Sequence, residues 1–304
     1  MEMTTTYVGT TNTDGTGSAS GLNAGNAALS LVGTGSVSAD GVSLDSTGGV
    51  LKATVLSSDS WNKKGYKEAK VDGDDHLVYV NNFVDVDIDN NNSQGASILV
   101  ANAKRGTIDT GNGNDAITIA AFSNSLNWGN LFEVNSGFGN DIITITHAKN
   151  SQFTRFDIDA GAGNDVVDVS GLLGPAVGAE HRFADGGSGF DVLKLSGTDT
   201  VSFENFEVVR GAGKIAPAAL TIDDALLAAN NAEAEVGFGL VLSNIDITLD
   251  GSILGHDSYE LTADEAMYLD AQGLDADDFY SVTVYTEEGA YQILTSDSDY
   301  APAV

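Results

Sequence analysis

Four segments of the chain repeat one acidic, glycine-rich pattern, [DN]-x-G-x-G-x-D-x-φ-x-φ, where φ is apolar. The closing aspartates of the pattern recur at spacings of 26, 24 and 26 residues. A carboxylate or amide at each end of a short glycine-containing loop offers several oxygen atoms to a hard cation. The segments are TIDTGNGNDAITI (107–119), EVNSGFGNDIITI (133–145), DIDAGAGNDVVDV (157–169) and FADGGSGFDVLKL (183–195).

The geometry of such a loop suits calcium. The two glycines allow positive φ, so the loop turns tightly and directs its carbonyls toward one point. Calcium takes 6–8 oxygens, of which one loop supplies about half, so two stacked loops would complete the shell. The candidate ligands are Asp109, Gly111, Gly113 and Asp115; Asn135, Gly137, Gly139 and Asp141; Asp159, Gly161, Gly163 and Asp165; and Asp185, Gly187, Gly189 and Asp191.

After each loop the residues alternate between apolar and polar, which is typical of a half-buried strand. Self-similarity at a nearly fixed period is the mark of a solenoid. The sequence therefore predicts a mainly β fold, a parallel β-solenoid or β-roll with one loop per coil and up to three cation sites between four loops. The residues expected to form the inner apolar ladder are Ile117, Ile119, Ile143, Ile145, Val167, Val169, Leu193 and Leu195.

The segments resemble the RTX, or haemolysin-type, calcium-binding nonapeptide G-G-x-G-x-D-x-U-x. The fourth segment, beginning at Gly186, matches it fully, whereas the others replace the first glycine with Thr110, Ser136 or Ala160. The resemblance implies a parallel β-roll with Ca²⁺ between turns, ligated by the aspartates and loop carbonyls named above. Tandem RTX repeats recur every 9 residues, so a loop every 24–26 residues is a departure that puts ligation on the opposite side in doubt.

The chain divides into three regions. Residues 1–70 form a Gly/Thr/Ser-rich β region, 71–214 hold the repeat, and 215–304 form a small acidic α+β region. Within the second region, 70–80 resembles an entry coil with Asp75 and Leu77 in the phase of the motif, and 197–213 resembles a closing segment.

Capping signals in the third region predict two short helices, over about 222–234 and 263–272. The signals are Thr221 with Asp224 and Thr262 with Glu265. Between them 239–249 is strand-like, and Glu288-Gly289 suits a hairpin turn.

Charge and cysteine content limit the partners and the compartment. The chain has 304 residues with 13 Lys+Arg against 44 Asp+Glu, a net charge of −31. Nucleic acid and anionic membranes are therefore poor partners, whereas cations are natural ones. Cysteine is absent, which excludes disulfides, thiolate nucleophiles and zinc–thiolate sites.

Several features favour export from the cell. No apolar run is long enough to span a bilayer, and the N-terminus lacks the pattern of a Sec signal peptide. Residues 215–304 contain no Lys or Arg and 18 acidic residues. This acidic end resembles the uncleaved secretion signal of type I exported RTX proteins, although an ordinary acidic cap has the same composition.

The sequence favours a secreted, non-enzymatic calcium-binding protein of the cell surface or extracellular matrix. We expect a surface-layer, filament or adhesin component that forms homo-oligomers or polymers and contacts cell-surface polysaccharide. The alternative is a calcium-dependent polysaccharide lyase or epimerase with Arg155 or Arg182 over a groove. Isolated histidines and missing nucleophile motifs give no other catalytic candidate.

Two further patterns have simple alternatives. Thr118, Thr144 and Thr146 suggest an ice-binding array, but Asp168 and Lys194 break the row. The lysines at 63, 64, 67 and 70 suit either a solvated loop or a contact with the acidic tail of a neighbouring copy.

Overall fold

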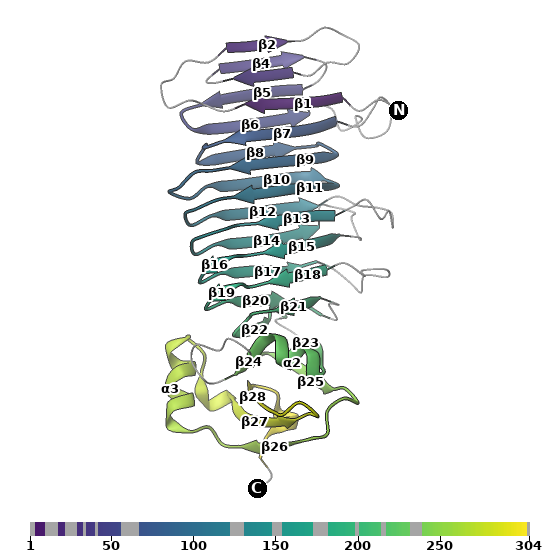
Figure 1. Cartoon of the computed structure of the whole chain (residues 1–304), viewed down its shortest axis with the longest axis vertical. Coiled ribbons are helices and arrows are strands. Elements are labelled where there is room, and N and C mark those ends of the chain that lie inside the picture. Colours follow the sequence, from purple (N-terminus) through teal and green to yellow (C-terminus); the bar gives the residue numbers. More distant parts are fainter. Residues whose placement is uncertain are drawn as a thin grey trace.

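The computed structural model describes most of the chain, with gaps. The described residues are 4–9, 18–21, 29–32, 35–39, 42–55, 67–121, 131–147, 154–172, 182–197, 201–213, 217–231 and 239–302. Lys63 and Lys64 of the lysine cluster lie outside them. Figure 1 shows a tall stack of strands with a smaller helix-containing region at its C-terminal end.

Two large sheets make up the stack, and most of their strand pairs are parallel. The ten-stranded sheet contains, in spatial order, β2 (Ser18–Gly21), β3 (Leu29–Val32), β1 (Thr4–Gly9), β7 (Lys67–Gly73), β9 (Asp85–Asn90), β11 (Arg105–Thr110), β13 (Leu131–Asn135), β15 (Arg155–Asp159), β18 (Arg182–Asp185) and β21 (Ser202–Glu204).

The fourteen-stranded sheet continues into the C-terminal region. Its order is β26 (Gly255–Tyr259), β27 (Tyr280–Tyr285), β28 (Ala290–Thr295), β24 (Leu240–Ser243), β22 (Val208–Gly211), β20 (Val192–Leu195), β17 (Val166–Gly171), β14 (Ile142–His147), β12 (Ala116–Ala121), β10 (Ser97–Ala103), β8 (Leu77–Asn81), β6 (Val50–Val55), β5 (Val42–Thr47) and β4 (Gly35–Ala39).

From β7 to β22 the chain alternates between the two sheets. Each strand pairs in parallel with the next strand of its own sheet, so β11 pairs with β13 and β12 with β14. This path places every acidic loop between a strand of the ten-stranded sheet and a strand of the other. The prediction of a mainly β chain built from parallel strands is therefore confirmed.

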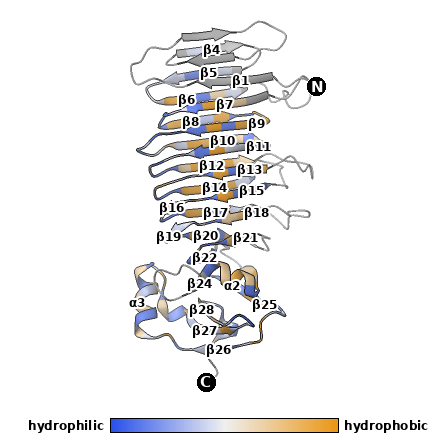
Figure 2. Ribbon diagram, in the orientation of Figure 1, coloured by the Kyte–Doolittle hydropathy of each residue, from blue (hydrophilic) through white to orange (hydrophobic). Residues whose placement is uncertain are grey.

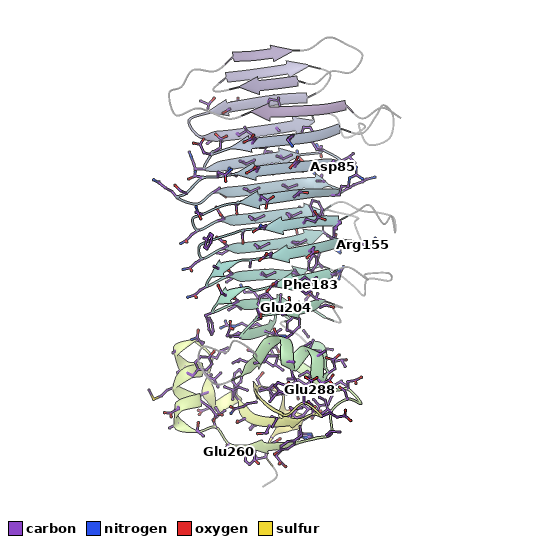
Figure 3. All side chains as sticks on the ribbon, viewed as in Figure 1. Asp85, Arg155, Phe183, Glu204, Glu260 and Glu288 are labelled. Atoms are coloured by element: carbon purple, nitrogen blue, oxygen red, sulfur yellow. The ribbon has the colours of Figure 1, made fainter. Side chains whose placement is uncertain are left out.

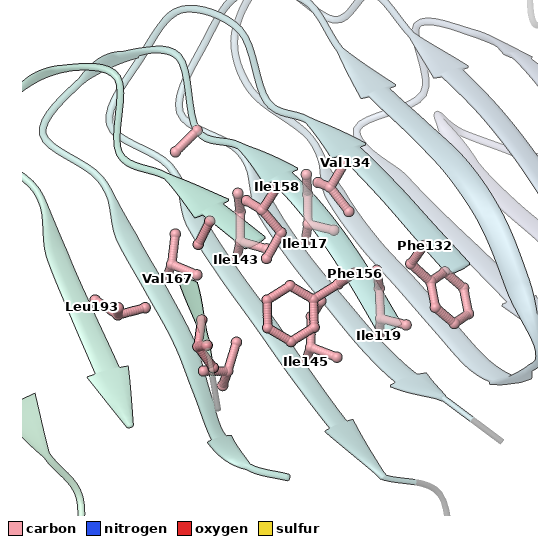
Figure 4. Packing of buried hydrophobic residues seen from close by; sticks show 14 of the residues in the cluster. Ile117, Ile119, Phe132, Val134, Ile143, Ile145, Phe156, Ile158, Val167 and Leu193 are labelled. Atoms are coloured by element: carbon pink, nitrogen blue, oxygen red, sulfur yellow. The ribbon is translucent and has the colours of Figure 1, made fainter. Parts of the chain in front are cut away.

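The core lies between the facing sheets. Strands β11 and β12 alternate buried and solvent-facing residues, as expected for strands with one covered face. All eight residues of the predicted apolar ladder are buried, and Phe132 and Phe156 of the ten-stranded sheet pack opposite them (Figure 4). In Figure 2 hydrophobic colour runs along the middle of the stacked strands.

The register of the entry coil differs by one residue from the prediction. Leu77 pairs with Ser97, which in turn pairs with Ala116, so Leu77 occupies an outward position. Val78, not Leu77, is the inward equivalent of Ile117. Asp75 is therefore one residue out of register with Asp115, yet its side chain is buried as that of Asp115 is, at 1% exposed.

The C-terminal region is joined to the stack by strand pairing. Strand β22 pairs with β24, and β23 (Ala218–Ile222) pairs with β25 (Ile245–Leu249) in a separate two-stranded sheet. The segment predicted as one strand over 239–249 is thus two strands, because Asn244 adopts φ 55° and turns the chain between them. The hairpin around Glu288-Gly289 is confirmed by the antiparallel pair β27–β28.

Both predicted helices are present. Helix α3 (Ala263–Ala271) begins with the expected capping box between Thr262 and Glu265. Helix α2 (Asp224–Asn231) begins differently, because the carboxylate of Asp223 accepts the Leu226 backbone N–H at 2.8 Å. The assignment of Thr221 as its cap was therefore wrong. Short 3₁₀ helices follow at Ala276–Asp278 and Ser298–Tyr300.

Candidate functional site

The acidic loops stack directly on one another through backbone hydrogen bonds. Phe138 N donates to Gly111 O at 2.9 Å, and Gly113 N donates to Phe138 O at 2.8 Å. The same pattern recurs nearer the C-terminal end of the stack, where β16 (Ala162–Gly163) pairs with β19 (Ser188–Gly189). The loops therefore form a continuous third ladder beside the two sheets.

This stacking explains the glycines. Gly139 and Gly163 have φ of 138° and 146°, and a Cβ on either would collide with the carbonyl oxygen of the preceding loop. Several predicted ligand carbonyls, such as Gly111 O and Gly137 O, accept hydrogen bonds from the neighbouring loop. Because a carbonyl oxygen has two lone pairs, such a bond leaves one for another partner.

The closing aspartates form a row inside the stack, which we call the inner row: Asp115, Asp141, Asp165 and Asp191. Each uses its Oδ1 atom to accept a backbone N–H from the coil before it. The Oδ1 atoms of Asp141, Asp165 and Asp191 accept the N–H groups of Asp115, Asp141 and Asp165, each at 2.7 Å. At the start of the row, Ala96 N donates to Asp115 at 2.5 Å.

The second oxygen of each inner-row carboxylate is buried. The four residues are at most 2% exposed, and none of their Oδ2 atoms has a hydrogen-bond partner. The ion pairs of the described part of the chain, such as Lys70–Asp87, do not include them. Four buried oxygens thus lie in a column that, among the described residues, has no basic side chain in an ion pair with it.

Burial raises the pKa of every inner-row carboxyl. Desolvation raises the pKa of Asp141 to about 6, of Asp165 to about 7 and of Asp191 to about 8, and it also raises the pKa of Asp115. Repulsion from the neighbouring carboxylates adds to desolvation for Asp141, Asp165 and Asp191. Hydrogen bonds from backbone N–H groups lower the pKa of all four carboxyls, and the side chains of Thr110 and Ser136 lower those of Asp115 and Asp141. Because the pKa rises toward Asp191, binding a proton or a cation stabilises the inner row most at its C-terminal end.

The residues that open each loop lie elsewhere, in an outer row. Asp109, Asn135, Asp159 and Asp185 pair in register at the ends of β11, β13, β15 and β18. The first three are exposed and Asp185 is half-buried. The Asp185 carboxylate accepts the Gly187 N–H at 2.9 Å, which stabilises the turn. The predicted side-chain ligands therefore fall into two separate rows.

A cation at the inner row would need ligands from more than one coil. Within the described ranges, no group of three or more His, Asp or Glu side chains is arranged to hold a metal ion. Adjacent rungs stand about 4.8 Å apart. A calcium ion between two rungs would therefore combine their carboxylates with backbone oxygens of the same loops. The unpartnered, buried Oδ2 atoms fit that requirement, and oxygen is the donor that calcium prefers.

The row ends on a residue that sequence reasoning missed. This residue is Glu207, which immediately precedes β22. Its Oε2 accepts the Asp191 backbone N–H at 2.6 Å. It occupies the position of an inner-row aspartate, because Val208 pairs with Val192. The apolar pair Val208-Val209 after an acidic residue was the available signal, but the glycine loop before it is absent.

Sequence reasoning also missed a ladder of asparagine side chains and an aromatic contact with the C-terminal region. The Asn114 and Asn140 side chains accept the backbone N–H groups of Asn140 and Asn164 at 2.9 and 2.8 Å. In the fourth loop Phe190 replaces the asparagine, and its ring meets Tyr268 of α3 edge-on at 6.3 Å. The replacement of the asparagine of G-N-D by Phe190 thus adds a contact between the fourth loop and the C-terminal region.

The arginines considered for catalysis, Arg155 and Arg182, are buried. Arg155, labelled in Figure 3, is only 7% exposed. Arg182 is 2% exposed, and its Nε donates to Thr154 O at 3.0 Å. Neither lines either of two clefts found among the described residues of the C-terminal half. One, of about 620 Å³, lies between β21 and α2, and the other, of about 700 Å³, is bordered by Asp275 and Asp297.

Comparison with known proteins returned no relative: no family model, curated protein or solved structure matches the chain. Among the described helices, none has the length and apolar character needed to cross a membrane.

Proposed function

We propose that the chain is a calcium-binding structural protein of the cell surface or extracellular matrix, exported by a type I system. In this proposal the alternating strands form a parallel β-solenoid with one RTX-like loop per coil. Calcium ions lie along the inner row and join successive coils. The protein serves as a surface-layer, filament or adhesin component that associates with further copies of itself.

The column of buried carboxylate oxygens carries the proposal. Stacked aspartates without a basic partner repel one another and are poorly solvated. A divalent cation between rungs would neutralise two charges at once and supply a partner for the unpaired Oδ2 atoms. Because the unfolded chain does not hold these oxygens together, calcium binding would contribute directly to folding.

Export and location follow from sequence features. The acidic C-terminal region, the absence of cysteine and the resemblance to RTX loops together favour secretion of an unfolded chain that folds in external calcium. The lyase or epimerase alternative has less support, since Arg155 and Arg182 are buried.

Circular dichroism and light scattering during a calcium titration of chelated protein test this function. We expect a transition to β structure with growing particle size. A transition without growth would support calcium binding and refute self-association. The absence of any transition would refute the calcium site. Magnesium at the same concentration is the control, because it accepts the irregular oxygen shell of a loop column less readily.

A further inference from the structure

The outward face of the fourteen-stranded sheet is free of charge over four of its strands, which lie between Lys52 on β6 and Asp168 on β17. Over β8, β10, β12 and β14 the outward positions contain no Asp, Glu, Lys or Arg. They are Leu77, Tyr79, Asn81, Ser97, Leu99, Ala101, Ala116, Thr118, Ala120, Ile142, Thr144 and Thr146. We call this surface the neutral face. Leu99 and Ile142 are 37% and 52% exposed, and Phe138 of the adjoining loop is 66% exposed.

The outward face of the ten-stranded sheet has the opposite character. Its register places acidic residues beside one another on successive strands, with Lys70 and Arg105 as the basic exceptions. The acidic residues are Asp72, Asp85, Asp87, Asp89, Asp109, Glu133, Asp157, Asp159, Asp185 and Glu204. Two copies of a chain with net charge −31 would repel strongly across this surface.

The neutral face continues beyond β14 with a self-compensated charge pair. On β17 and β20, Asp168 and Lys194 lie 4.0 Å apart, while Val166 and Val192 extend the apolar row. The six strands from β8 to β20 span about 29 Å at about 4.8 Å per strand, and five residues span about 17 Å. One face thus measures about 490 Å², and two faces together bury about 1,000 Å², the lower limit of a specific interface.

We infer that the neutral face is the surface through which a second copy of this chain docks, sheet against sheet. This inference rests on the self-association in the proposed function and names its interface. Like-charged copies approach one another most easily where charge is absent, and the neutral face is such a surface among the described strands. Small residues lie beside the large ones, since Ala116 pairs with both Ser97 and Ile142, so opposed faces can interdigitate as in stacked sheets. The acidic faces then point outward from the pair.

Single-cysteine crosslinking tests this interface, since the chain has no cysteine of its own. Thr118→Cys places the thiol at the centre of the neutral face. Thr107→Cys is its matched control, because Thr107 is a half-buried threonine in the same coil on the acidic face. Both proteins are treated with a bismaleimide in calcium concentrations at which circular dichroism shows complete folding. We expect a covalent dimer from Thr118→Cys at least tenfold more abundant than from Thr107→Cys.

Sedimentation of a charged variant provides an independent measurement. Ile142→Glu adds like charge to each opposed face, so we expect a shift from dimer to monomer at tens of micromolar. Thr107→Glu, on the acidic face, leaves the dimer intact. Equal crosslinking at the two positions, or an Ile142→Glu dimer, would overturn the interface. A wild-type protein that folds with calcium but stays monomeric would refute this inference while leaving the calcium site standing.

Discussion

Replacing Asp165 with asparagine should change stability in opposite directions with and without calcium. The substitution keeps the shape of the side chain and an oxygen for the Asp141 N–H, but removes a buried charge. The raised pKa of the Asp165 carboxyl, about 7 against 3.8, corresponds to about 4 kcal/mol of destabilisation at pH 8, at about 1.4 kcal/mol per pKa unit. Asparagine leaves a buried amide donor, which costs about 1–3 kcal/mol.

In chelator at pH 8, Asp165→Asn is therefore expected to be more stable than the wild type by about 2 kcal/mol. With calcium at 100 times its dissociation constant, each site adds about 2.7 kcal/mol to the wild type. Asp165 has a carboxylate rung on either side, so the variant loses two sites, or about 5 kcal/mol. The order of stabilities then inverts, with the variant about 3 kcal/mol below the wild type.

Urea unfolding in chelator and in calcium measures this inversion. Asp157→Asn is the matched control, because Asp157 is an exposed aspartate in the same coil and outside both rows. It should change neither stability by more than about 0.5 kcal/mol. The reasoning would be refuted if Asp165→Asn changed the free energy of unfolding equally in both conditions, which means that calcium stabilises the variant as much as the wild type.

Three other predictions follow from the same geometry. In calcium-free solution the midpoint temperature of thermal unfolding should decrease as the pH is raised from 5 to 8. The raised pKa values of Asp141, Asp165 and Asp191 mean that the folded state holds protons that the unfolded chain has released, and scanning calorimetry would detect the opposite trend if this is wrong. Gly163→Ala should destabilise by about 3 kcal/mol through the collision with Gly139 O, against under about 1 kcal/mol for Gly251→Ala in open space, as read from urea midpoints. Phe190→Ala should speed amide hydrogen exchange in α3 and leave that of β12 unchanged; uniform acceleration would contradict a local role.

Much of the strand pattern was predictable because the repeat is regular. Alternation after each loop assigns Ile117 and Ile143 to the core whatever the neighbouring coils do. The loop positions and the helix beginning at Ala263 were predictable for the same reason: their signals are local. The prediction for the entry coil was wrong at Leu77, because one residue of slip moves a strand residue to the other face and 70–80 carries no glycine pair at the motif spacing to set its register.

The candidate site was predictable in its residues but not in its arrangement. The spacing identifies Asp109 and Asp115 as oxygen donors, but it does not reveal that one faces solvent and the other the interior. That separation depends on the register between coils. Glu207 and Phe190 depend in the same way on contacts with segments outside the repeat.

Anomalous diffraction from crystals grown with calcium tests the central claim most directly. The account predicts a line of peaks along the inner row, each about 2.3–2.6 Å from carboxylate oxygens of adjacent rungs among Asp115, Asp141, Asp165 and Asp191. Peaks confined to the outer row at Asp109, Asp159 and Asp185 would contradict it. An inner row without peaks in millimolar calcium would do the same.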